Sequence, residues 1–141
     1  MEPTDALKQL TLLYVEDEDI ARLSIGSFLR RYVGTLLLAS NGSEGLQLYQ
    51  ENRPAVVITD LEMPVMNGIL ATRKISEQYP QVRVLVLTTF DDDEWLFDAV
   101  RAGAKGYLLK DRPRAELIRA IKGTVQGNSF IDPAVAGKLL G

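Results

Sequence analysis

The chain has 141 residues, of which 46% are apolar and 25% charged, and its 16 basic and 19 acidic side chains leave a net charge of −3. These values are typical of one globular domain, long enough to bury roughly 70% of its unfolded surface around a single core. The weak negative charge gives no electrostatic reason for this chain by itself to bind DNA, RNA or an anionic membrane.

Two residue types are absent from the chain, and their absence excludes several chemistries. Without cysteine there is no disulfide, zinc–thiolate site or thiol nucleophile. Without histidine there is no Ser-His triad, no histidine-ligated metal and no phosphohistidine carried by this chain. No apolar run approaches the ~20 residues that span a bilayer, and the acidic N-terminus lacks the features of a signal peptide. We therefore expect a cytoplasmic protein with no membrane partner.

Five short apolar runs recur along the chain. They are leucine-rich or β-branched and do not alternate with polar residues, which is typical of strands buried on both faces of a parallel sheet. The predicted strands are Leu12 to Val15, Leu36 to Ala39, Val56 to Ile58, Val84 to Leu87 and Tyr107 to Leu109.

An amphipathic segment follows each apolar run, and proline, glycine and acidic residues mark where these segments begin and end. The predicted helices are Asp19 to Tyr32, Ser43 to Glu51, a segment from Asn67-Gly68 to just before Pro80, Asp91 to Gly103, and a segment from Pro113 to the region of Gly123 to Gly127. The first helix is expected to carry an apolar stripe formed by Ile20, Leu23, Phe28 and Leu29.

The alternation of strands and helices predicts the fold class. Five β-then-α units of roughly two dozen residues favour an open, doubly wound α/β domain with a five-stranded parallel sheet. A closed (β/α)8 barrel would need about 250 residues and is excluded. We expect the flavodoxin-like strand order 2-1-3-4-5 for residues 1–128. Residues 129–141 are interpreted as a turn and a short extra helix that lead into a linker.

Polar residues fall at the carboxyl ends of the predicted strands. Glu16 and Asp17 follow the first strand, and Asp60 follows the third. In the order 2-1-3-4-5 these two strands are neighbours at the topological switch point, where doubly wound folds bind ligands. We therefore expect the three carboxylates to lie together. Thr88 and Lys110, at the ends of the fourth and fifth strands, are expected at the same edge.

Three neighbouring carboxylates require a cation, because two such charges ~4 Å apart repel by roughly 4 kcal/mol at an effective dielectric of 20. Oxygen ligands without histidine or cysteine favour a hard divalent ion, Mg²⁺ first and Mn²⁺ second. Mg²⁺ keeps several waters and binds one or two carboxylates together with phosphate oxygens. The sequence thus predicts a site suited to phosphoryl transfer.

Four separated motifs resemble one known family. They are Val15-Glu16-Asp17-Glu18, the run from Thr59 to Gly68, Leu87-Thr88, and Gly106-Tyr107-Leu108-Leu109-Lys110. In this order and register they resemble the CheY-like receiver domain of two-component response regulators, over about residues 9–128. The stretch from Ala102 to Asp111 is similar to the NarL/FixJ branch, whose regulators carry a C-terminal LuxR-type helix-turn-helix domain.

The resemblance implies a phosphoacceptor and a set of metal ligands. Asp60 would take a phosphoryl group from the histidine of a sensor kinase and become an aspartyl phosphate. Glu16, Asp17, Asp60 and the main-chain carbonyl of Glu62 would hold Mg²⁺, directly or through water. A carboxylate that is aligned and held by a metal is a competent nucleophile.

The resemblance also implies how the phosphorylated state is sensed. Thr88 would donate its hydroxyl to the phosphoryl oxygens, Lys110 would pair with them, and Tyr107 would follow Thr88 inward as a rotameric switch. The chain would be a signalling domain rather than a turnover enzyme. Its output would be homodimerisation and control of transcription, with DNA bound only through a C-terminal helix-turn-helix domain beyond the linker.

Two other functions remain open from the sequence. Asp60-Leu61-Glu62 imitates the Asp-x-Asp pair of haloacid-dehalogenase-like phosphatases, although its third residue is glutamate and its nucleophile follows the third strand rather than the first. The chain is also compatible with a receiver-shaped interaction module that never takes phosphate, although all four motifs are intact. Phosphoryl uptake from acetyl phosphate and Mg²⁺ would separate these functions.

Overall fold

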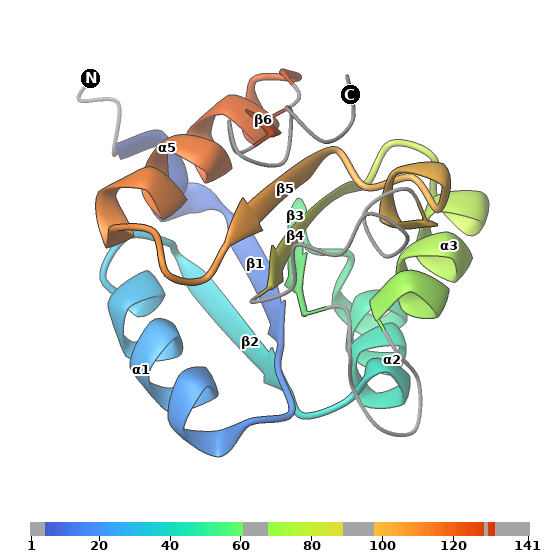
Figure 1. Cartoon of the computed structure of the whole chain (residues 1–141), viewed down its shortest axis with the longest axis horizontal. Coiled ribbons are helices and arrows are strands. Elements are labelled where there is room, and N and C mark those ends of the chain that lie inside the picture. Colours follow the sequence, from blue (N-terminus) through green and yellow to red (C-terminus); the bar gives the residue numbers. More distant parts are fainter. Residues whose placement is uncertain (1–4, 61–67, 89–97, 129, 132–141) are drawn as a thin grey trace.

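A parallel sheet runs through the centre of the computed structural model, which describes residues 5–60, 68–88, 98–128 and 130–131 (Figure 1). Among these residues the strand order is β2-β1-β3-β4-β5-β6, and every neighbouring pair is parallel. The strands are β1 (Thr11–Val15), β2 (Thr35–Ala39), β3 (Val56–Thr59), β4 (Arg83–Thr88), β5 (Gly106–Leu109) and β6 (Phe130–Ile131). The helices are η1 (Asp5–Gln9), α1 (Asp19–Arg30), α2 (Gly42–Asn52), α3 (Gly68–Gln78) and α5 (Arg114–Val125).

Helices cover both faces of this sheet, which explains why its strands are continuously apolar. Successive side chains of a strand point to opposite faces. Leu12 and Tyr14 of β1 therefore join a core beneath α1 and α5, whereas Leu13 and Val15 join a second core beneath α2 and α3. Figure 1 shows α1 and α5 on one side of the strands and α2 and α3 on the other. None of the described helices has the length and apolar character needed to cross a bilayer.

The predicted order 2-1-3-4-5 is confirmed, and each predicted strand matches to within about one residue at either end. One strand was not predicted: Phe130–Ile131 forms β6, which extends the sheet beside Gly106 and Tyr107 of β5. Two residues are too few to show a periodic pattern, so this pairing cannot be recognised from the sequence. The extra helix predicted for the tail lies outside the described residues.

The helices begin and end near the predicted positions, but the expected apolar stripe of α1 is only half correct. Leu29 is fully buried and Phe28 packs against the core, whereas Ile20 is 78% exposed and Leu23 63% exposed. At 3.6 residues per turn, Ile20 lies on the side of the helix opposite to Leu29. Ile25, one turn before Leu29, takes the core position instead.

The fourth predicted helix is described only near its end. Residues 98–101 are helical, and the segment stops at Gly103, as predicted. Gly103 has a φ of 110°, a conformation that favours glycine, and a Cβ there would lie 2.6 Å from Oγ of Ser76. The predicted start at Asp91 lies outside the described residues.

Gly34 is a position where an added methyl group should destabilise the fold. A Cβ there would lie 2.2 Å from the backbone oxygen of Lys8, while the Gly34 N–H donates to the Leu10 oxygen at 3.0 Å. We expect Gly34→Ala to lower the free energy of unfolding by about 1–3 kcal/mol, because backbone atoms must move apart. Urea denaturation measures this loss.

Gly123→Ala is the matched control for that substitution. Gly123 lies in α5 with no heavy atom within 4 Å of its Cβ position, so the same change should raise stability by about 0.4–1 kcal/mol. Equal effects of the two substitutions would contradict the close approach at Gly34.

Candidate functional site

The parallel register of β1 and β3 brings the acidic residues together. Val15 pairs with Thr59, so the residues that follow them, Glu16 and Asp60, leave the sheet side by side. The backbone continues the ladder, because the Asp60 N–H donates to the Val15 oxygen at 3.3 Å and the Glu16 N–H donates to the Ala39 oxygen at 2.9 Å. The predicted adjacency at this edge of the sheet is therefore a consequence of strand pairing.

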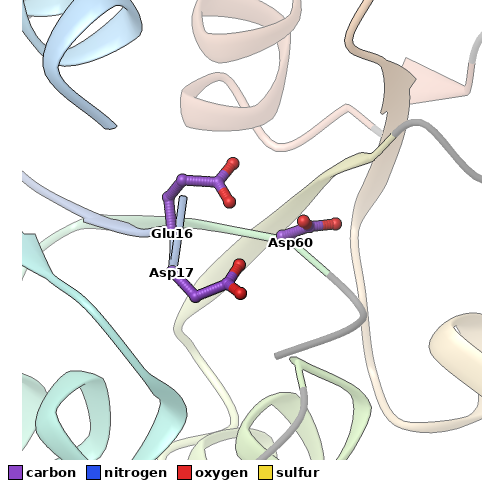
Figure 2. Close-up of side chains that lie close together, drawn as sticks. All are labelled: Glu16, Asp17 and Asp60. Carbon is purple, nitrogen blue, oxygen red and sulfur yellow. The ribbon is translucent and has the colours of Figure 1, made fainter. Parts of the chain in front are cut away.

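Three carboxylates converge at this edge. Glu16, Asp17 and Asp60 each offer an oxygen, and these oxygens all lie within 4.8 Å of one another. Figure 2 shows the side chains of Glu16 and Asp17 reaching from the end of β1 toward that of Asp60. Glu16 and Asp60 are buried, whereas Asp17 is exposed. The site thus opens to solvent on the side of Asp17.

Lys110 bridges two of these carboxylates. It follows β5, and its Nζ pairs with Oε1 of Glu16 and lies 3.1 Å from Oδ2 of Asp60. The predicted proximity of this lysine to the acidic cluster is confirmed. One ammonium between two buried carboxylates offsets part of the repulsion among three negative charges.

Burial and the ion pair shift the pKa values of Glu16 and Lys110 in opposite directions. Burial raises the pKa of Glu16 above its usual range, against the hydrogen bond and charge of Lys110, which lower it. Burial lowers the pKa of Lys110, but the hydrogen bond to Glu16 and the charges of Asp60 and Glu16 outweigh it, so this pKa is raised. The lysine is therefore charged at neutral pH.

Two residues that support Glu16 were not predicted. The Tyr14 hydroxyl donates to Oε1 of Glu16 at 3.2 Å, and Nη1 of Arg22 donates to the Glu16 main-chain oxygen at 2.8 Å. Burial, together with the charge of Glu16, raises the pKa of Tyr14, so its hydroxyl keeps the proton that it donates. A signal for Tyr14 existed in the sequence, because residues two apart on a strand share a face. Arg22 had no such signal, since its contact crosses the loop into α1.

Of the remaining predicted site residues, the structure describes Thr88 and Tyr107 but not Glu62. Thr88 ends β4 and pairs with Leu109, so its backbone lies at the same edge as Lys110. Tyr107 is 1% exposed and packs with Val86 and Ala99. Glu62, whose main-chain carbonyl was predicted as a metal ligand, lies outside the described residues.

A cavity of about 640 Å³ opens beside the carboxylates. Besides the acidic residues and Lys110, its lining includes the exposed Ile20 of α1 and Arg114 of α5. Carboxylates that line an accessible cavity, with an ammonium beside them, can hold a hard divalent cation and a phosphoryl group together.

The sequence is similar to that of a known domain family. Residues 12–122 match the family model of the response regulator receiver domain. The oxygen regulatory protein NreC of Staphylococcus epidermidis is 36% identical over 135 residues, which cover 93% of this chain and 62% of NreC. The chain therefore spans less than two thirds of the length of such relatives.

Solved structures show the same similarity. A two-component response regulator of the LuxR family from Aurantimonas sp. SI85-9A1 superposes with a TM-score of 0.86 at 30% identity, over 94% of this chain and 96% of that one. The response regulator ChrA of a heme-sensing two-component system has a TM-score of 0.79 at 33% identity, over 95% of this chain and 65% of ChrA.

Proposed function

Since the chain belongs to the family of response regulator receiver domains of two-component systems, we propose that Asp60 is its phosphoacceptor, with Mg²⁺ held beside it by Glu16 and Asp17. The phosphoryl group would come from the histidine of a sensor kinase, and this chain, which has no histidine, would act as the receiving partner.

The observation that carries this proposal is the clustering of three carboxylates around one lysine. Asp60 directly follows β3 and Glu16 directly follows β1, so both buried carboxylates lie at the switch point of the sheet, while Asp17 stays open to solvent. The carboxylates of Glu16 and Asp60 are already aligned by Lys110. Positioning and charge stabilisation are what phosphoryl transfer mainly requires.

The donor set fits Mg²⁺. Three carboxylates within 4.8 Å of one another supply hard oxygen ligands, and the chain contains neither cysteine nor histidine to favour a softer metal. Glu16, Asp17, Asp60 and the main-chain carbonyl of Glu62 would hold the ion, and Mn²⁺ would be accepted as well. When bound, it would offset negative charge on the phosphoryl oxygens.

In the proposed step a carboxylate oxygen of Asp60 forms a bond to phosphorus. The phosphorus–nitrogen bond to the kinase histidine breaks, and its electron pair returns to the imidazole ring. Lys110 would then pair with the phosphoryl oxygens instead of the Asp60 carboxylate, because the new group carries more negative charge. The hydroxyl of Thr88 would donate to the same oxygens.

The switch would follow from these new contacts. A state in which Thr88 and Lys110 reach the phosphoryl group is stabilised by it, so phosphorylation shifts the population toward that state. The ring of Tyr107 is already buried, with 1% of its surface exposed, so this switch residue would hold that inward position behind Thr88 in the phosphorylated state. Ile131 of β6 packs against the cluster that contains Tyr107, which supports a route from the switch to the chain beyond α5.

We propose homodimerisation and transcriptional control as the output of this switch, exerted on DNA through a C-terminal helix-turn-helix domain. The chain would be a signalling domain that is phosphorylated and dephosphorylated, rather than a turnover enzyme. Its cytoplasmic location stays a prediction from the sequence.

The test is incubation with acetyl phosphate and Mg²⁺ followed by intact-mass measurement. We expect the mass of one phosphoryl group on the wild-type chain and none on Asp60→Asn, because the amide cannot act as the nucleophile. Asp98→Asn is the matched control, since Asp98 lies on the surface with Arg101 as its ion-pair partner. It should retain the adduct, and EDTA should prevent the adduct on every variant.

Three outcomes would overturn the proposal. An adduct that persists on Asp60→Asn would move the phosphoacceptor elsewhere, and no adduct on the wild-type chain would favour the interaction module. Continuous release of phosphate over many turnovers would instead support the phosphatase.

A further inference from the structure

We propose that Tyr14 is a positioning residue for the metal site: its hydroxyl holds the Glu16 carboxylate in the orientation in which it serves Mg²⁺, an inference that rests on the proposed function. Tyr14 lies in β1 and Glu16 directly follows that strand, two residues further along on the same side of the sheet, and both are fully buried. The hydroxyl donates to Oε1 of Glu16 at 3.2 Å.

The Glu16 carboxylate is held by three donors of different mobility. Its Oε1 accepts from Tyr14 and pairs with Lys110, and its Oε2 accepts from the Glu18 N–H at 3.3 Å. Lys110 has a flexible stem, and in the proposed mechanism it turns to the phosphoryl group. The donor that remains on Oε1 is then the Tyr14 hydroxyl.

Tyr14 is well suited to be the permanent donor. Its backbone pairs with Leu38 on one side and Ile58 on the other, and its ring lies in the core beneath α1 and α5. Because strand pairing and packing hold the ring, the hydroxyl oxygen has a fixed position relative to the Glu16 carboxylate. Glutamate has one more methylene than aspartate and therefore one more rotatable bond, so fixing its carboxylate matters more for Glu16 than for a shorter ligand.

A simpler reading is that the carboxylate merely satisfies a buried hydroxyl, as any nearby acceptor would. The two interpretations predict different effects of the hydroxyl on metal affinity. Groups that hydrogen-bond a metal ligand fix its orientation, and their loss typically weakens metal binding by about 10–100-fold. A hydroxyl that only needs an acceptor could be removed without changing metal affinity.

The experiment titrates the full chain with Mn²⁺ and measures free ion by electron paramagnetic resonance, which needs no phosphorylation. We expect Tyr14→Phe to weaken Mn²⁺ binding by about tenfold. Tyr49→Phe is the matched control, because Tyr49 is also buried but its ring packs at a tilt against that of Tyr79 in the loop after α3, away from the carboxylates. Tyr49→Phe should bind Mn²⁺ with the same affinity as the wild-type chain.

A double-variant cycle assigns the effect to Glu16. In a Glu16→Asp background the shorter arm withdraws the carboxylate from the hydroxyl, so adding Tyr14→Phe should change Mn²⁺ affinity by less than about twofold. A second readout is phosphoryl uptake from acetyl phosphate. Tyr14→Phe should raise the Mg²⁺ concentration for half-maximal rate while leaving the rate at saturating Mg²⁺ unchanged.

Equal or tighter Mn²⁺ binding by Tyr14→Phe would overturn the inference and leave the proposed function intact. So would a loss of the same size in the Glu16→Asp background, because the effect would then not pass through Glu16. If the wild-type chain bound no Mn²⁺, the proposed metal site would fail and the role of Tyr14 would fail with it.

Discussion

Lys110→Met is expected to lower the free energy of unfolding in EDTA at neutral pH by about 3–5 kcal/mol, the usual cost of removing one partner of a buried ion pair. The lysine side chain is 13% exposed, and its partner Glu16 is fully buried. Methionine fills a similar volume without the charge, so the ammonium that pairs with both Glu16 and Asp60 is removed. Urea denaturation at several pH values measures the deficit.

The deficit should depend on pH with a definite sign. Burial raises the pKa of Glu16 above 4.5, and removing Lys110 removes the interactions that oppose this rise. The folded variant then holds a proton that the unfolded chain has lost, so its stability falls as the pH rises above 4.5. The pKa of Lys110 is raised above 10.5, so the wild-type advantage persists up to that pH and is lost beyond it. The two stabilities should therefore converge in acid and in strong alkali.

Two controls separate this effect from a general loss of charge. Lys105 is exposed, so Lys105→Met should change stability by no more than about 0.5 kcal/mol. Mg²⁺ should restore more stability to Lys110→Met than to the wild-type chain, because ligands of the folded state stabilise it by mass action. A deficit independent of pH, or one no larger than that of Lys105→Met, would contradict the pairing.

Ile58→Ala should cost about 2–5 kcal/mol, and Ile58→Val only about 0.5–1.5 kcal/mol. Ile58 is fully buried in β3, where it pairs with Tyr14 and Leu85 and packs in the core beneath α1 and α5. Truncation to alanine leaves a cavity between the sheet and these helices, whereas valine leaves a much smaller one. Chemical denaturation of both variants at one temperature gives the comparison.

Phosphoryl uptake by Ile58→Ala should survive below its unfolding transition. The backbone hydrogen bond from Asp60 to Val15 and the pairing of Thr59 with Val15 do not involve the Ile58 side chain. If Ile58→Ala and Ile58→Val lost equal stability, the site would not be the close-packed core position that its burial indicates.

Local pattern was enough to predict the strands and the edge at which the acidic residues gather. Strands buried on both faces have to be apolar throughout, and in a parallel sheet their carboxyl ends share one edge. The positions of Glu16, Asp17 and Asp60 therefore follow from the strand assignment and the order of the sheet.

Contacts between segments that are distant in the sequence could not be predicted from local sequence pattern. That Lys110 pairs with Glu16 as well as Asp60 depends on how far a flexible side chain reaches across β3 and β4. The exposure of Ile20 depends on which side of α1 meets the sheet. The pairing of β6 with β5 depends on the turn after α5, which returns the chain to an open sheet edge.

The amino-acid order alone was sufficient for the class of fold and for the carboxylate cluster, because the periodicity of a strand and the residues that follow it are local properties. Which donors hold each carboxylate, and which face of α1 stays in water, emerged only when the chain was folded. Those features depend on contacts between side chains that are far apart in the sequence. The number of residues between two side chains does not give the distance between them in the folded structure.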